Sequence, residues 1–320
     1  MRLGPLTFAI AAAFLPAPAP AQEYPSRPVL FVVPYAPGGG TETMARLLGR
    51  RLEQRLGKPF VIDNRPGAGT AIGATFVAKS APDGHTILLA TSTTLAINVS
   101  IYRSLAYDPL KDLVPISMAA VFANVLVVQP ALPVKNIGDY VKYAKQKPGV
   151  TYASSGIGGA GHLAGELLKK VAQIDIVHVP YKGGGPAMQG FLGGQVDSFF
   201  ATPISTASQI RSGKARAIAT TGAKRDPLMP DVPTVAEAGY PGYEALNWYG
   251  YLAPAKTPKE VVERLHRDIA KALANPKVVE GLRKTGVEPV AMTPDEFGRY
   301  IKREYDTWGK VVKQAGIKAQ

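Results

Sequence analysis

Four glycine-rich segments hold the residues of this sequence that are best suited to chemistry. They are residues 38–40 (GGG), 67–69 (GAG), 156–161 (GIGGAG) and 183–186 (GGGP), and each precedes a predicted helix start. A glycine turn lets the backbone approach a ligand closely, and a helix N-terminus presents unpaired N–H groups and the positive end of the helix dipole. Because these two features together form an anion site, we expect at least two of the loops to bind an anion at the carboxyl ends of their strands.

Neutral hydrogen-bond donors flank these loops. Thr41 follows the first glycine run, and Ser154 and Ser155 precede the third. His162 stands at the start of the helix after the third run, and four hydroxyl residues, 91–94, follow another apolar run. Hydroxyl groups suit reversible capture of a carboxylate, whereas a highly charged phosphate would call for arginine. The pattern therefore predicts a carboxylate site, with His162 as one of its contacts.

Three kinds of enzyme site are present only in part. Residues 156–161 match the dinucleotide motif G-x-G-x-x-G, but Asp175 precedes the next predicted strand, whereas the motif needs an acid at that strand's end. Ser155, His162 and Asp197 supply the residue types of a serine hydrolase without the G-x-S-x-G turn. The four histidines stand apart and there is no cysteine, so no metal site is expected. We expect neither a cofactor nor a catalytic residue, and a nucleotide-dependent enzyme is the less favoured alternative.

The composition is that of a globular protein with a surplus of positive charge. Of the 320 residues, 46% are hydrophobic and 19% are charged, and the formal net charge is +13, close to the average for soluble domains apart from the charge. No run of five basic residues occurs, and acids usually stand near the basic residues. This distribution disfavours nucleic-acid binding and indicates a surface that attracts anions.

The N-terminus has the three parts of a secretory signal peptide. Met1 and Arg2 give a positive start, residues 3–15 are apolar, and Ala19-Pro20-Ala21 is a small-x-small cleavage site. We predict cleavage before Gln22 and a periplasmic location. The alternative is an N-terminal membrane anchor, although the apolar run is too short to span a bilayer.

Strands alternate with helices over the first two thirds of the mature chain. Apolar, β-rich runs predict strands at 29–33, 60–62, 86–90, 124–128, 150–153, 176–179 and 215–220, and the spacing of Met44, Leu48 and Leu52 predicts a helix over 41–56. This alternation predicts an α/β fold with mostly parallel sheets. The last third is helical, and TPKE at 257–260 and TPDE at 293–296 are capping boxes that predict two helix starts.

Eight short motifs carry a family resemblance. They are YPSRP at 24–28, VPYAPGGG at 33–40, DNRPGAG at 63–69, APDG at 81–84, HVPYKGGG at 178–185, PDVPT at 230–234, WYG at 248–250, and Trp308 with AGI at 315–317. In this order, over nearly the whole mature chain, they resemble the Bug family, also called TctC-like, the solute receptors of tripartite tricarboxylate transporters. Two positions depart from the family pattern. Glu42 stands where Asp is usual, and Thr70-Ala71 stands where Gly or Asn is common.

The resemblance implies a two-lobed periplasmic binding protein of type II, a Venus flytrap with α/β lobes and the ligand in the cleft between them. We expect residues 22–122 plus 246–320 to form one lobe and residues 123–245 the other, with hinge closure around the ligand. The implied ligand is a small carboxylate, which is an aliphatic di- or tricarboxylate, an aromatic carboxylate or an amino acid. The implied partners are the integral membrane permease subunits of the transporter, and a monomer is expected.

The resemblance gives the ligand carboxylate to the loop after the first strand of each lobe, and these are two of the loops chosen above. The expected ligand-binding residues are Gly38, Gly39, Gly40, Thr41, Glu42, Thr91, Ser92, Ser154, Ser155, Gly156, Gly158, Gly159, Ala160, His162, Tyr181 and Asp197. Tyr181 and Lys182 are candidates for closing the cleft, and Asp197 is a candidate for holding an amine or organising water, with a surface or structural role as the alternative. A ligand-sensing receptor for a signalling partner is the alternative to transport, and the sequence leaves that choice open.

Overall fold

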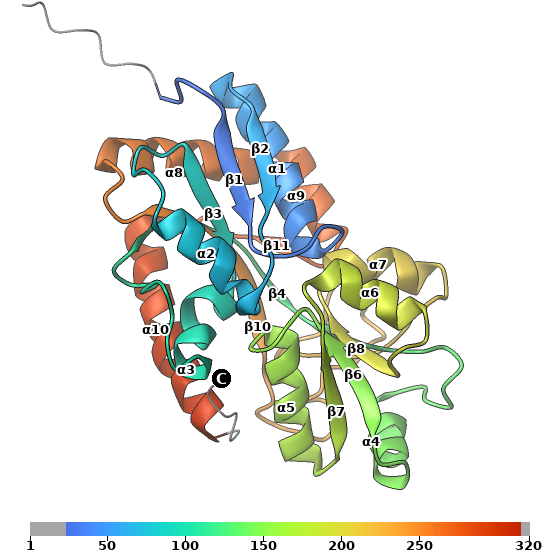
Figure 1. Cartoon of the computed structure of the whole chain (residues 1–320). Coiled ribbons are helices and arrows are strands. Elements are labelled where there is room, and N and C mark those ends of the chain that lie inside the picture. The colour runs from blue at the N-terminus through green and yellow to red at the C-terminus, as the bar shows by residue number, and fades with distance from the viewer. Residues whose placement is uncertain (1–23, 315–320) are drawn as a thin grey trace, which may run out of the picture.

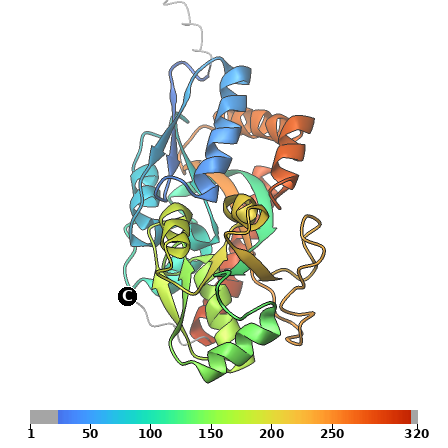
Figure 2. The same cartoon turned by 90° about the vertical axis from the view of Figure 1, so that its right-hand side faces the viewer.

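The computed structural model describes residues 24–314. The predicted signal peptide and its cleavage site before Gln22 lie outside these residues. The described chain forms two β-sheets, each covered by helices (Figure 1). Figure 2 shows the six-stranded sheet above the five-stranded one. We call the six-stranded sheet with its helices lobe 1, and the five-stranded sheet with its helices lobe 2.

The sheet of lobe 1 has the strand order β11-β4-β10-β3-β1-β2. β1 pairs in parallel with β2 and β3, whereas β10 pairs antiparallel with β3 and β4. Parallel neighbours end at one edge of a sheet, and β1 and β2 end at the edge nearest lobe 2 (Figure 1). The strand bounds are β1 Val29–Val33, β2 Phe60–Asn64, β3 Thr86–Ala90, β4 Leu113–Ala123, β10 Leu246–Pro254 and β11 Glu288–Pro289.

Helices cover both faces of this sheet, because successive side chains of a strand point to opposite faces. Phe31 of β1 packs in a cluster with residues of α1, α8 and α9, while the next residue, Val32, packs in a cluster with residues of α2 and α10. The helix bounds are α1 Gly40–Leu56, α2 Ala71–Ala78, α3 Asn98–Ile101, α8 Lys259–Leu273, α9 Pro276–Arg283 and α10 Pro294–Gln314. A 3-10 turn, Ala68–Thr70, precedes α2, and a π-helical turn, Thr93–Ile97, precedes α3.

The sheet of lobe 2 has the order β7-β6-β8-β5-β9, and α4 and α5 pack on one face while α6 packs on the other. β6 is parallel to β7 and β8, and β5 is antiparallel to β8 and β9. The strand bounds are β5 Val125–Val128, β6 Val150–Ser154, β7 Ile176–Pro180, β8 Ser198–Ala201 and β9 Arg216–Thr220. The helix bounds are α4 Ile137–Gln146, α5 Ala160–Ala172, α6 Gly184–Leu192 and α7 Pro203–Arg211.

The chain crosses between the lobes twice, and Thr221 ties the two crossings together. β4 runs into β5 through Asn124, and β10 begins directly after Ala245. The Thr221 N–H donates to the Asn124 carbonyl over 2.9 Å, and the Ala245 N–H donates to the Thr221 carbonyl over 2.8 Å. The Thr221 hydroxyl accepts from the Asn124 N–H over 2.8 Å and donates to the Ala245 carbonyl over 2.6 Å. These four hydrogen bonds hold the crossings side by side; the exact lobe boundaries, 22–122 plus 246–320 and 123–245, stay a prediction.

The seven predicted strands are all present, each within two residues of its expected bounds. The expectation of mostly parallel sheets is wrong, because the described strands form four parallel and five antiparallel pairs. The antiparallel pairs all involve β4, β5 or β10, the strands that flank the crossings. No helix within residues 24–314 combines the length and the apolar character needed to cross a membrane.

One of the two predicted capping boxes is confirmed. The Thr293 N–H donates to the Glu296 carboxylate over 2.9 Å, and the Glu296 N–H donates to the Thr293 hydroxyl over 3.3 Å. The prediction of a capping box at 257–260 is wrong, because Pro258 is the N-cap of α8 and its side chain cannot accept a hydrogen bond. The buried Thr257 hydroxyl has no hydrogen-bond partner within the described chain.

Candidate functional site

Four helices from the two lobes begin at one small cavity. Gly40 and Thr41 open α1, Gly161 lies in the first turn of α5, Gly184 opens α6, and Thr202 is the N-cap of α7; all five line the cavity. The first N–H groups of a helix have no partner inside it, and the helix dipole is positive at this end. The cavity, which we call the polar cavity, has a volume of about 20 Å³, room for about one water molecule. Such a convergence of helix starts is an arrangement that favours an anion.

A second cavity of about 250 Å³, which we call the loop cavity, shares Tyr35 and Ser155 with the first. The two cavities together are the cleft. Lobe 1 supplies Pro34, Tyr35, Gly67, Ala68, Gly69, Thr70, Thr93 and Tyr102 to the loop cavity, and lobe 2 supplies Ser155, Gly156, Ile157, Gly159, Pro180, Tyr181 and Lys182. The cleft therefore lies between the lobes, at the carboxyl ends of β1, β3, β6 and β7.

The lobes touch each other beside the cleft, so this is a closed arrangement. The Ala36 N–H of lobe 1 donates to the Lys182 carbonyl of lobe 2 over 2.9 Å. The start of α6 lies against the first glycine run so closely that a Cβ on Gly185 would clash with the Pro37 carbonyl oxygen. On the other side of the cleft, Leu163 of α5 belongs to an apolar cluster with lobe 1 residues Ala96, Ile97, Ile101, Trp308 and Val312.

Two residues that line the polar cavity, one between β4 and β5 and one on β10, have a buried hydrogen-bond donor without a partner. The Tyr249 hydroxyl and the Asn124 amide nitrogen form no hydrogen bond within residues 24–314, and both residues are almost wholly buried. The hydroxyls of Thr41 and Thr202 lie near that of Tyr249 but outside hydrogen-bond geometry. Burial raises the pKa of Tyr249, so its hydroxyl is a neutral donor. An unpaired buried donor costs about 1–3 kcal/mol, and a bound acceptor offsets that cost.

Asn247 of β10 adds a third donor to the polar cavity. Its side-chain oxygen accepts from the Ser92 hydroxyl over 3.2 Å and from the Trp248 N–H over 2.8 Å. Because both bonds go to the oxygen, the amide nitrogen is the group that Asn247 offers to the cavity it lines. Tyr35, on the same wall, is held by a 2.9 Å bond between its hydroxyl and that of Thr91.

The loop before α2 brings a strained backbone to the loop cavity. Ala68 and Thr70 have φ of +44° and +82°, values that cost a non-glycine residue on the order of 1 kcal/mol or more. Asn98 holds the loop, because its amide nitrogen donates to the Gly69 carbonyl over 2.7 Å and to the Thr70 hydroxyl over 3.3 Å. Strain of this kind concentrates at functional sites.

A stacked pair of histidines shapes the glycine loop of lobe 2. The rings of His162 and His178 lie 4.0 Å apart between centroids, and the His162 Nδ1 accepts from the Gly158 N–H over 3.1 Å. The His178 Nε2 lies 2.6 Å from the Ser154 hydroxyl. Burial lowers the pKa of His162, and burial together with the His162 charge lowers the pKa of His178 to about 3. Both rings are therefore neutral near pH 7 and serve to hold the loop.

Seven of the expected ligand residues line the cleft: Gly40, Thr41, Thr91, Ser155, Gly156, Gly159 and Tyr181. Gly38 and Gly39 instead face the start of α6, Gly158 faces Ile101, and Ala160 lies in the first turn of α5. Ser92, Ser154 and His162 are buried behind the cleft wall, where they bond to Asn247, to Gly156 and to Gly158 respectively.

Glu42 and Asp197 are not brought to the cleft. The Glu42 carboxylate accepts from the Gly38 N–H over 2.6 Å and pairs with Arg46, so it holds the first glycine run in shape. Asp197 lies just before β8, whereas the cleft is at the other end of that strand. Its carboxylate accepts from the N–H and the hydroxyl of Thr151, both over 2.8 Å. Neither acid is placed to meet a ligand.

Several cleft residues were not predicted from the sequence, among them Asn124, Thr202, Asn247, Tyr102 and Tyr249. Asn124 and Asn247 each interrupt an apolar run at a point where the chain crosses between lobes. A polar residue in such a position is the one sequence feature that could have indicated them. Thr202 and Tyr102 carry no comparable pattern.

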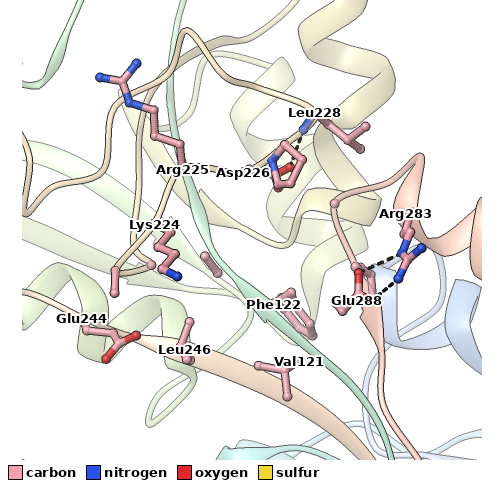
Figure 3. A pocket seen from close by; sticks show the side chains of 16 residues that line it. Val121, Phe122, Lys224, Arg225, Asp226, Leu228, Glu244, Leu246, Arg283 and Glu288 are labelled. Atoms are coloured by element: carbon pink, nitrogen blue, oxygen red, sulfur yellow. Dashed lines mark hydrogen bonds and ion pairs between the residues drawn. The ribbon is translucent and has the colours of Figure 1, made fainter.

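A much larger hollow of about 860 Å³, the side pocket, lies beside β4 and β10 (Figure 3). Its walls include Val121, Phe122 and Leu246 of β4 and β10, together with charged side chains on its rim. Arg283 there is paired with Glu288 by hydrogen bonds of 3.0 and 2.6 Å. None of the four helix starts of the polar cavity lines it.

Comparison with known proteins decides the family. Residues 44–317 match the family described as tripartite tricarboxylate transporter family receptor. Protein BugT of Bordetella pertussis is 40% identical over 311 residues, which cover 97% of this chain and 95% of BugT. The chain belongs to this family of receptors. The receptor thus has the family relationship that its motifs predicted, and the family is one of periplasmic solute receptors.

Solved structures give the same fold. The periplasmic binding protein BugD has a TM-score of 0.90 at 37% identity, with 93% of the receptor and all of BugD covered. A protein of R. palustris solved with adipate has a TM-score of 0.91 at 38% identity, with 93% and 100% covered. MatC of Rhodopseudomonas palustris, solved with bound malate, has a TM-score of 0.86 at 33% identity, with 90% and 100% covered. The predicted fold, a two-lobed α/β periplasmic binding protein, is confirmed.

Proposed function

We propose that the receptor captures a small carboxylate in its cleft and delivers it, with the lobes closed, to the membrane permease subunits of a tripartite transporter. The convergence of four helix N-termini on one cavity, beside two unpaired buried donors, carries this proposal. Neutral donors and helix dipoles bind a carboxylate reversibly, which suits capture and release without turnover. Related structures solved with adipate and with malate support the ligand class.

We propose export by the N-terminal signal peptide, cleavage before Gln22, and action as a periplasmic monomer with lobes 22–122 plus 246–320 and 123–245. The ligand contacts we propose are the seven expected residues that line the cleft together with Tyr35, Asn124, Thr202, Asn247 and Tyr249. Ser92, Ser154 and His162 act by holding these contacts in place.

Calorimetric titration of the mature protein tests this function. The panel contains succinate, malate, adipate, citrate, benzoate, aspartate and NAD. We expect binding of at least one carboxylate with one site per chain, and a rise in unfolding free energy of about 2.7 kcal/mol at a hundredfold excess over its Kd. Binding of NAD with no carboxylate bound would contradict the proposal and revive the dinucleotide motif at residues 156–161.

A further inference from the structure

Beside the cleft, an apolar patch of lobe 1 receives one leucine of lobe 2. Leu163 of α5 is 2% exposed, and among the described residues it is the one buried lobe 2 member of its apolar cluster. The buried members from lobe 1, which we call the seat, are Ala96, Ile97, Ile101, Trp308 and Val312. They come from the π-helical turn before α3, from α3 and from α10, on the side of lobe 1 that faces α5 (Figure 1). The closed arrangement therefore buries Leu163 against the seat.

The glycine loop of lobe 2 lies against the same seat. A Cβ on Gly158 would lie 2.7 Å from the Cδ1 atom of Ile101 and 3.4 Å from the Cγ2 atom of Ile97. The N–H of Gly158 donates to His162, so the histidine holds this loop from within lobe 2 while the seat contacts it from lobe 1. The seat therefore meets lobe 2 at the loop that also lines the cleft.

Glu304 fixes the largest residue of the seat from within lobe 1. One of its carboxylate oxygens accepts from the indole N–H of Trp308 over 3.0 Å and from the indole N–H of Trp248 over 3.1 Å. Trp248 is fully buried on β10, between Asn247 and Tyr249 of the polar cavity. All three partners belong to lobe 1, so these bonds do not depend on lobe 2. The indole of Trp308 is therefore already ordered when the lobes close, which lowers the entropic cost of the contact.

The contact between Leu163 and the seat stabilises the closed state alone. Leu163 belongs to neither of the two apolar core clusters of lobe 2 in the described chain, so separation of the lobes would expose it together with the seat. Exposed apolar patches on soluble proteins mark contact surfaces. Burial of one leucine side chain shifts an equilibrium by about ten- to a hundredfold.

We infer that Leu163 and the seat form a latch that holds the lobes closed, with Glu304 as the residue that positions Trp308 in it. The inference rests on the proposed function, because it explains how a captured molecule is retained. None of the described residues that line the cleft belongs to the latch. The latch acts on the lobes rather than on the ligand, so it raises the affinity for different ligands by the same factor.

Two leucines of the same helix give a matched pair of variants. Leu163→Ala removes most of the latch side chain, and Leu168→Ala removes an equally buried side chain from the core of lobe 2. Should Leu163→Ala fail to fold, Val312→Ala weakens the latch from the lobe 1 side and should act in the same direction. The chain has no cysteine. Val61→Cys and Val171→Cys, both exposed and one in each lobe, therefore accept two spin labels whose separation reports closure in pulsed electron paramagnetic resonance.

The closed fraction is measured without ligand and during titrations with malate and with adipate. The concentration at which half of the receptors are closed should rise about tenfold or more in Leu163→Ala, by the same factor for both acids, and stay within about twofold in Leu168→Ala. Glu304→Gln keeps an acceptor oxygen for the two indoles and should match the unaltered receptor, whereas Glu304→Ala should raise this concentration severalfold.

The inference is overturned by an unchanged concentration in Leu163→Ala, by an equal rise in Leu168→Ala, or by a receptor without a closed population in any condition. If neither acid binds, the closed fractions of the ligand-free variants are compared, and equal fractions overturn it as well. Calorimetric titration of the same proteins shows separately whether carboxylates bind, so failure of the latch leaves the proposed function standing, and absence of binding by every carboxylate is a failure of the proposed function.

Discussion

Tyr249→Phe, which removes a single oxygen atom, should weaken ligand binding without lowering the free energy of unfolding. The Tyr249 hydroxyl is buried beside the polar cavity with no partner in the described chain, while the ring packs against Phe122 with centroids 4.7 Å apart. Tyr249→Phe keeps the ring and deletes only the unpaired donor. The free energy of unfolding without ligand should therefore stay the same or rise, by up to about 1–3 kcal/mol if the full desolvation cost is removed.

Ligand affinity should change in the opposite direction. A hydrogen bond to a charged group contributes about 1.5–3 kcal/mol, so loss of the bond from the Tyr249 hydroxyl to the ligand carboxylate should raise the Kd about ten- to a hundredfold. Titration calorimetry gives the Kd, and urea denaturation of the ligand-free protein gives the unfolding free energy.

Tyr251→Phe is the matched control on the same strand. The Tyr251 hydroxyl is also fully buried and has no partner in the described chain, but Tyr251 does not line the cleft. This variant should match Tyr249→Phe in stability and bind the ligand as tightly as the unaltered receptor. The reasoning is refuted if Tyr249→Phe is destabilised with an unchanged Kd, or if both variants lose affinity equally.

Three further predictions concern closure, the hinge and pH. Gly185→Ala should weaken ligand binding about tenfold or more without lowering the melting temperature of the ligand-free protein, because the atoms nearest to its Cβ belong to Pro37 and Gly38 of the other lobe. Gly281→Ala is the control, since this position has open space around it; equal ligand affinities of the two variants would refute the prediction. Thr221→Val should lower the unfolding free energy, measured by urea denaturation, by about 2–4 kcal/mol, because it removes the side-chain hydrogen bonds of the Asn124 N–H and the Ala245 carbonyl. A loss below about 1 kcal/mol would contradict the role of Thr221 in holding the two crossings together. Burial lowers the pKa of His178 to about 3, so as the pH falls this histidine is protonated in the unfolded chain before it is protonated in the folded one. The free energy of unfolding should therefore be highest above about pH 6.5 and fall by about 1 kcal/mol between pH 7 and pH 5, a value reduced for this partly exposed ring. A His178→Gln variant whose unfolding free energy changes with pH as in the unaltered receptor would contradict this.

The fold and part of the site could be predicted because they depend on local patterns. Period-two and period-3.6 runs gave the strands of the parallel units and α1, and glycine runs before helices gave the start of the polar cavity. β4 and β10 were not predicted from the sequence, because both strands are apolar on both faces. Each also contains a residue that is atypical of a strand interior, Pro115 in β4 and Gly250 in β10.

Residues that depend on long-range placement could not be predicted. Asn124 and Asn247 are 123 positions apart, and only the two crossings of the chain bring both to the polar cavity. His162 lies beside a glycine loop of the cleft, as expected, but its ring stacks on His178 of the neighbouring strand β7. Asp197 was misplaced because sequence alone does not tell which end of β8 faces the cleft.

A crystal structure of the receptor with the carboxylate that titrates most tightly tests the central claim most directly. We predict one carboxylate group at the polar cavity, with an oxygen about 2.5–3.0 Å from the Tyr249 hydroxyl and others within reach of the N–H groups that open α1 and α5. A ligand found in the side pocket lined by Val121 and Leu246, or one in the cleft with its carboxylates turned away from the helix starts, would contradict the account.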